Sequence, residues 1–96
     1  MSEYIYLLHP LSDNFFDHPT PEQNNIMENH FDYLKKAAEV GKLLLAGPCL
    51  DNTFGIVIFM AVNDDAAHTF MFNDPCIKNN VMMAELHPMR ISVRNH

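Results

Sequence analysis

The feature that most limits how this 96-residue chain can fold is a predicted strand, residues 54–62, that is apolar on both faces. Side chains alternate between the two faces of a strand, so an antiparallel strand with one wet face alternates apolar and polar residues. Here neither set of alternate positions contains a polar side chain. Residues 43–46 also have nothing polar on either face. The pattern predicts a sheet whose two faces are both covered.

The order of the predicted elements defines the fold class. The expected strands are residues 4–8, 43–46, 54–62 and 81–93, and the expected helices are residues 21–40 and 64–73. A βαββαβ order of this length suits an α+β, ferredoxin-like fold, a four-stranded antiparallel sheet with two helices on one face. The other face would expose more apolar surface than a monomer normally tolerates. We therefore expect a homodimer that joins two sheets face to face.

Local signals set the ends of the two helices. Thr20 and Gln23 form a Thr-x-x-Gln capping box, and a proline occupies the first helical position between them. Gly41 follows the last periodic residue and stops this helix. Asp74 precedes Pro75, which disfavours helical backbone at Asp74 and ends the second helix there.

Charge and composition exclude several classes of partner. Twelve Asp and Glu against six Lys and Arg give a net charge of −6 with His neutral, which repels phosphate backbones and anionic lipid. We therefore expect neither nucleic acid nor a membrane as a partner. No stretch approaches 18 apolar residues, and the N-terminus has no basic region. Cys49 and Cys76 are too few for a disulfide scaffold. One cytoplasmic domain is expected over residues 1–96.

Two polar residues occupy inward-facing helical positions. His30 falls within the apolar stripe of the first helix, which also contains Phe31 and Leu34, while Lys35 is expected on the opposite, polar face. Asp74 ends the corresponding stripe of the second helix. The two helices of a ferredoxin-like fold run antiparallel, so the end of one approaches the first half of the other. The sequence thus predicts that His30 and Asp74 approach each other.

Such a pair has a catalytic and a structural interpretation. A carboxylate beside an imidazole holds its orientation, and the pair can act as a general base or acid. In that case His30 exchanges the proton and Asp74 fixes its tautomer. In the alternative, His30 is a core histidine bonded to a backbone carbonyl, and Asp74 only caps the turn before Pro75.

Other side chains are weaker candidates. Tyr6 lies on a strand face from which its hydroxyl can reach a pocket. Arg90 on the last strand either anchors a substrate carboxylate or solvates the strand end. His9, His87 and Glu85 lack the spacing of a metal site. The three glycines lie well apart, so a phosphate-binding loop is not supported. We expect no metal and no cofactor.

The sequence resembles the YciI-like (YCII domain) family, which belongs to the dimeric α+β barrel superfamily. The resemblance rests on residues 30–34, on residues 41–48 (Gly-Lys-Leu-Leu-Leu-Ala-Gly-Pro), on Asp51 and Gly55, and on the Asp-Pro pair at 74–75. It implies a dimeric ferredoxin-like α+β barrel similar to muconolactone isomerase. It also implies a His–Asp active site, which maps here to His30 and Asp74.

Two functions from different classes fit these features. The first is a cofactor-free lyase or isomerase that moves a proton on a small organic substrate, as in the dehydrochlorinase branch that the resemblance brings in. The second is a non-catalytic homodimeric module that binds a small ligand or a partner domain. Turnover that depends on His30 distinguishes the two functions.

Overall fold

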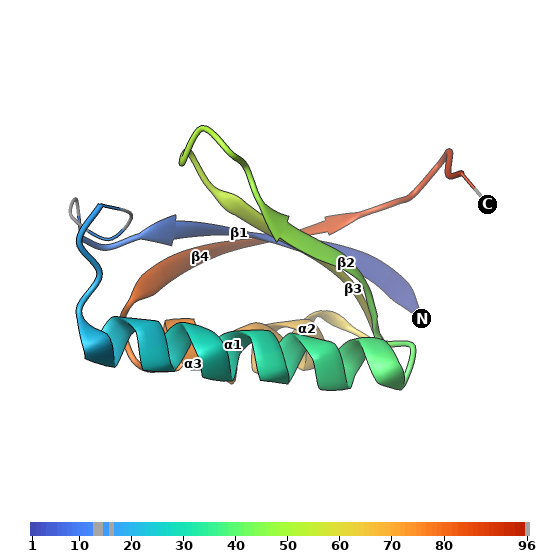
Figure 1. Cartoon of the computed structure of the whole chain (residues 1–96). Helices are drawn as coiled ribbons and strands as arrows, with labels where there is room; N and C mark the ends of the chain where they lie inside the picture. Colours follow the sequence, from blue (N-terminus) through green and yellow to red (C-terminus); the bar gives the residue numbers. More distant parts are fainter. Residues whose placement is uncertain (13–14, 16, 96) are drawn as a thin grey trace.

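The structure of the chain is a computed structural model that describes residues 1–12, 15 and 17–95. Its elements, shown in Figure 1, are β1 (Ser2–Pro10), α1 (Pro21–Glu39), β2 (Leu43–Pro48), β3 (Gly55–Ala61), α2 (Asp64–Phe72), α3 (Pro75–Lys78) and β4 (Met82–Met89). The predicted alternation of strands and helices is confirmed. The short helix α3 is added between α2 and β4.

The four strands form one antiparallel sheet in the order β2-β3-β1-β4. The two central strands, β3 and β1, are therefore the third and the first in the chain. The helices cover one face of this sheet, and no helix of the described part of the chain covers the opposite face (Figure 1). This arrangement confirms the predicted α+β, ferredoxin-like class, in which helices segregate to one face of an antiparallel sheet.

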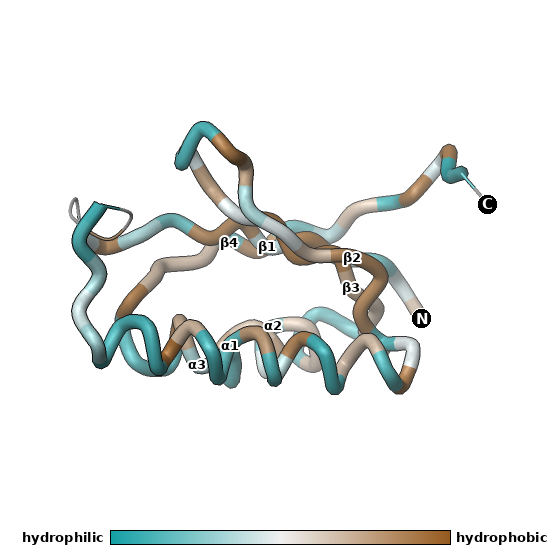
Figure 2. The backbone as a smooth tube through the Cα atoms, in the orientation of Figure 1, coloured by the Kyte–Doolittle hydropathy of each residue, from teal (hydrophilic) through white to brown (hydrophobic). Residues whose placement is uncertain are grey.

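The core lies between the sheet and the helices. On β1, Tyr4, Tyr6 and Leu8 point toward the helices and are buried. Tyr4 pairs with Phe59 and Tyr6 pairs with Val57 on β3, and both β3 side chains are also buried. Figure 2 shows that α1 alternates between hydrophobic and hydrophilic segments, as expected of a helix with one face on the core.

The uncovered face of the sheet is apolar at its centre. The strand register places Ile5 beside Ile58, Leu7 beside Ile56, and Leu45 beside Ile58. We call these five side chains the open face. Leu45 is 52% exposed in the single chain. The predicted two-sided apolar character of the sheet is thus present, although only one side is covered within one chain.

Strand β4 ends four residues earlier than predicted, at Met89 instead of Val93. The reason is the length of its neighbour, because Met89 pairs with Glu3 and β1 begins at Ser2. Residues beyond Met89 have almost no strand left to pair with. Arg90 consequently lies after the strand and not on it.

The signals at the helix ends act as predicted. Thr20 caps α1 with both reciprocal hydrogen bonds of the capping box, and Gly41 follows the helix with φ +78°. The second predicted helix ends at Phe72, so that Asp74 becomes the N-cap of α3. Across the described ranges, we find no helix with the length and apolar content needed to cross a bilayer.

Candidate active site

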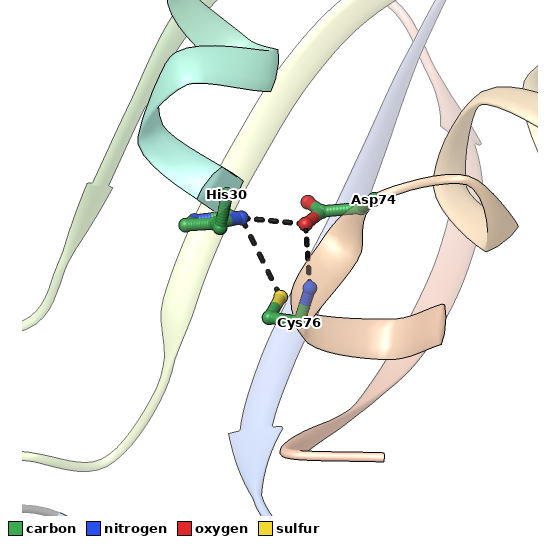
Figure 3. Close-up of side chains that lie close together, drawn as sticks. All are labelled: His30, Asp74 and Cys76. Atoms are coloured by element: carbon green, nitrogen blue, oxygen red, sulfur yellow. Dashed lines mark hydrogen bonds and ion pairs between the residues drawn. The ribbon is translucent and has the colours of Figure 1, made fainter. Parts of the chain in front are cut away.

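The buried carboxylate of Asp74 is the centre of the candidate site. Its side chain has no solvent exposure, and its two oxygens receive three hydrogen bonds. Oδ1 contacts Nδ1 of His30 at 2.6 Å and accepts from the backbone N–H of Cys76 at 3.2 Å (Figure 3). Oδ2 accepts from the hydroxyl of Tyr6 at 2.7 Å. Both oxygens are therefore satisfied within the protein.

Three separate elements bring these groups together. Tyr6 lies on β1 and His30 on α1, while Asp74 lies between α2 and α3. The backbone at Asp74 is extended, with φ −62° and ψ 125°, as the following proline requires. This conformation starts α3, and the carboxylate caps that helix through the amide of Cys76. Asp74 is thus both the contact partner of His30 and the N-cap of the helix that begins at Pro75.

The hydrogen bonds keep Asp74 ionised. Burial by itself raises the pKa of this carboxyl group, but hydrogen bonding and charge interaction with His30 oppose burial, and Tyr6 and Cys76 add further donors. The balance leaves the pKa of Asp74 below its usual value. An ionised carboxylate only accepts hydrogen bonds, so Nδ1 of His30 carries the proton in this contact. The other ring nitrogen, Nε2, then has a free lone pair in the neutral imidazole.

Tyr6 and Cys76 are held in their neutral, protonated forms beside the pair. Burial raises the pKa of the Tyr6 phenol far above its usual value, and the charge of Asp74 raises it further. Burial also raises the pKa of the Cys76 thiol, with Asp74 again adding to the effect. The Cys76 sulfur lies 3.4 Å from Nδ1 of His30. A thiol held in its protonated form is a poor nucleophile, so Cys76 is a passive neighbour.

A cavity of about 370 Å³ lies between α1 and the β2–β3 side of the sheet. His30 lines this cavity, whereas Asp74, Tyr6 and Cys76 do not. Because Nδ1 faces Asp74, Nε2 is the ring nitrogen left for a ligand in the cavity. The rest of the wall is apolar except for Lys35. An apolar space of this size with few polar groups is typical of a small-molecule site.

The predicted site residues have different positions relative to this cavity. His30 and Asp74 are in contact, and the Tyr6 hydroxyl contacts Asp74 from β1. Arg90 is exposed beyond β4 and does not line the cavity of the single chain. His87 pairs instead with Glu85 at 2.8 Å, where both side chains are more than half exposed. The catalytic and binding roles assigned to these residues stay predictions.

The sequence patterns missed two side chains at the cavity. Phe31 was expected in the apolar stripe but is 48% exposed and lines the wall, and Lys35 was expected on the polar face. Both lie at the border between the two faces of α1, where a periodicity argument is least certain. Phe31 and Lys35 are four residues apart and so lie on one ridge of the helix. This spacing is the sequence signal that could have placed both at the same wall.

The His30, Asp74 and Cys76 side chains also form a cluster whose possible ligand atoms lie within 4.8 Å of one another. The 2.6 Å between Nδ1 and Oδ1 is a hydrogen-bond distance. Two ligands on one zinc ion, each about 2 Å from the metal in tetrahedral geometry, stand roughly 3 Å or more apart. The geometry therefore corresponds to a hydrogen-bonded pair.

Fold and site together define a ferredoxin-like α+β protein with a buried His–Asp pair beside an apolar cavity. A family model described as the YCII-related domain matches residues 4–89, and the chain belongs to this family. The sequence-based identification is thereby confirmed. Comparison with curated proteins gave no significant match.

One similar solved structure is 5-chloro-2-hydroxyhydroquinone dehydrochlorinase from Burkholderia phenoliruptrix, in complex with 2,5-dihydroxybenzoquinone. The TM-score is 0.72 and the sequence identity is 18%. The similarity covers 92% of this chain and 93% of that one. At this identity the comparison establishes a shared fold over nearly the whole of both chains.

The hydroxyl of Tyr6 should matter more to stability than that of Tyr4, its neighbour on the same buried strand face. Tyr6→Phe leaves Oδ2 of the buried Asp74 without a donor, which costs about 1–3 kcal/mol. Tyr4→Phe is the matched control, because its hydroxyl donates to the exposed Asp64 and its loss leaves an oxygen that water can reach. Urea unfolding at pH 7 measures both. Equal losses of stability would contradict the importance assigned to the buried carboxylate.

The stability contributed by Asp74 should disappear in acid. Its pKa is lower in the folded state than the unfolded value of about 3.9, so this contribution is present above pH 4 and is lost as the pH falls toward the folded pKa. We expect Asp74→Asn to lower the free energy of unfolding by about 1.5–3 kcal/mol at pH 6. The difference from wild type should shrink between pH 5 and pH 3 in urea unfolding. A difference that is constant over this range would show that the charge of Asp74 is not involved.

Proposed function

We propose that this protein is a small enzyme that moves a proton on an organic substrate without a cofactor, with His30 as the proton-exchanging group. The observation that carries the proposal is the 2.6 Å contact between Nδ1 of His30 and the buried Asp74, on a histidine that lines an apolar cavity. Membership of the YCII-related family and the dehydrochlorinase fold neighbour support a small-molecule enzyme.

The proposed chemistry follows from the arrangement of the two ring nitrogens. Nε2 of His30 accepts a proton from a substrate carbon or oxygen in the cavity, which makes the ring an imidazolium. Asp74 already accepts the Nδ1 proton and stabilises this cation. In an isomerase, the imidazolium returns the proton to a different substrate atom. In a lyase, the electron pair left on the substrate forms a double bond and expels a leaving group such as chloride.

Tyr6 acts in this proposal as a positioning residue. The sequence predicted that its hydroxyl reaches the substrate pocket. In the structure the hydroxyl donates to Oδ2 of Asp74, and the side chain is fully buried. Its hydrogen bond to Oδ2 helps to hold the Asp74 carboxylate beside His30. Substrate binding by Arg90 is left as a sequence-based prediction, because Arg90 lies outside the cavity wall of the single chain.

The catalytic proposal is tested by turnover on a panel of lactones and chlorinated hydroquinones, with chloride release and ring absorbance as readouts. We expect His30→Ala to lose at least about 100-fold in kcat/KM, the usual contribution of a general base. His68→Ala is the control, since His68 is exposed on α2. Ligand binding retained in His30→Ala, with no turnover by wild type on any substrate, would favour the non-catalytic binding module.

We also propose that two chains associate through the open face. Its five apolar side chains come from β1, β2 and β3 and lie on the sheet face that no described helix covers. An exposed apolar patch of this kind marks an interaction surface in water-soluble folds, and a second copy of the same sheet matches it in shape and polarity.

Light scattering tests the assembly. We expect a mass of about 22 kDa at micromolar concentration, twice the 11.0 kDa of one chain. Ile58→Lys, at the centre of the open face, should shift the mass toward that of one chain because it buries an unpaired charge. Val40→Lys is the control, since Val40 is an exposed apolar residue at the end of α1. A wild-type mass of 11 kDa would refute association.

A cytoplasmic location is the third part of the proposal. Cys49 and Cys76 are both free thiols, and Cys76 is buried beside His30. Disulfides are the usual state of paired cysteines in oxidising compartments, so two free thiols fit a reducing one.

A further inference from the structure

Among the described residues that line the cavity, Lys35 is the one lysine or arginine. The chain has six Lys and Arg residues, and the other five do not line the cavity. Within the described ranges, Lys35 forms no ion pair with an acidic side chain. The protein carries a net charge of −6, so a cationic side chain without an acidic partner beside an apolar cavity is unusual in this chain. It is available to pair with a charge on a ligand.

The position of Lys35 on α1 relates it to His30. Met27, Phe31 and Lys35 follow one another at intervals of four residues, and all three line the cavity. The exposed Lys35 can lay its methylene groups along this apolar ridge while its ammonium group stays in water at the edge. Lys35 lies five residues after His30, or about 7.5 Å further along the helix axis. Five residues also turn the helix by about 140°, so a ligand that reaches both side chains passes across Phe31, which lies between them around the helix.

Phe31 supplies an aromatic surface between them. Its ring centroid is 5.2 Å from that of His30, and the side chain is 48% exposed although it belongs to the apolar stripe. A large apolar side chain that is half exposed at a cavity wall offers contact area to an apolar ligand. The acidic neighbours on α1, Asp32 and Glu39, do not line the cavity and so do not oppose an anion inside it.

We propose that the cavity selects apolar organic anions, and that Lys35 is the residue that determines this selectivity. The carboxylate or phenolate of the ligand pairs with the Lys35 ammonium at the edge, its apolar body lies against Phe31, and its far end reaches His30. This inference deepens the proposed function, on which it rests for the use of the cavity as the substrate site. Lys35 is a specificity residue and takes no part in the proton transfer.

The test compares two probes of the same shape that differ in charge, 4-chlorobenzoate and 4-chlorobenzamide, by NMR titration of the full chain. We expect wild type to bind the carboxylate more tightly than the amide. Lys35→Met should weaken carboxylate binding about 3- to 10-fold and leave amide binding unchanged, as loss of one partly exposed ion pair implies. Lys35→Arg should retain the preference. Added salt should reduce the difference in affinity between carboxylate and amide in wild type, because it screens the ion pair.

Lys36→Met is the matched control, because it removes the same charge from the next position of α1, which does not line the cavity. Equal weakening by Lys36→Met would mean that net charge alone is responsible, and would overturn the proposal. So would equal affinity of wild type for both probes, or binding of neither at millimolar concentration.

Selectivity and catalysis can fail separately. His30→Ala should keep the preference for the carboxylate, since the ion pair is at the other end of the ligand. If the protein prefers the carboxylate but turns over no substrate, the anion site at Lys35 is supported and the proposed catalysis is contradicted. If it turns over a substrate but shows no preference that depends on Lys35, catalysis is supported and the anion site is contradicted.

Discussion

The buried carboxylate of Asp74 is the constraint on which the rest of the structure depends. An ionised group without solvent exposure costs several kcal/mol unless it is paired and hydrogen-bonded. This cost is met by donors from three parts of the chain, Tyr6 on β1, His30 on α1 and the amide of Cys76 on α3. The sheet, the long helix and the α2–α3 junction are therefore fixed relative to one another at one point.

The same arrangement supports the acid–base chemistry that we propose for His30. A carboxylate satisfied by rigid elements does not have to reorganise when His30 gains a proton, and preorganised charge is the main source of electrostatic catalysis. Only the imidazole reaches the cavity wall, while its partners lie behind it in the core. His30 is thus the residue that connects the buried hydrogen-bond network of Asp74 with the cavity.

Much of this could be predicted from the sequence because the signals were local or periodic. The capping box at Thr20, the stop at Gly41 and the inward position of His30 all follow from spacing along one element. The contact of Tyr6 with Asp74 could not be predicted, because it depends on how far β1 and α3 are apart in space and spans 68 residues. The early end of β4 similarly depends on where its partner β1 begins.

The open face and the cavity share part of their structure. Leu45 and Ile56 belong to the open face, and both also line the cavity. A second chain packed on the open face would contact these two side chains and so affect the shape of the cavity wall. A ligand in the cavity would contact the same two side chains from the other direction. Any such coupling is reciprocal. If association of two chains changes the free energy of ligand binding, ligand binding changes the free energy of association by the same amount. With the association proposed above, the protein concentration would therefore affect ligand affinity, just as the ligand concentration would affect association.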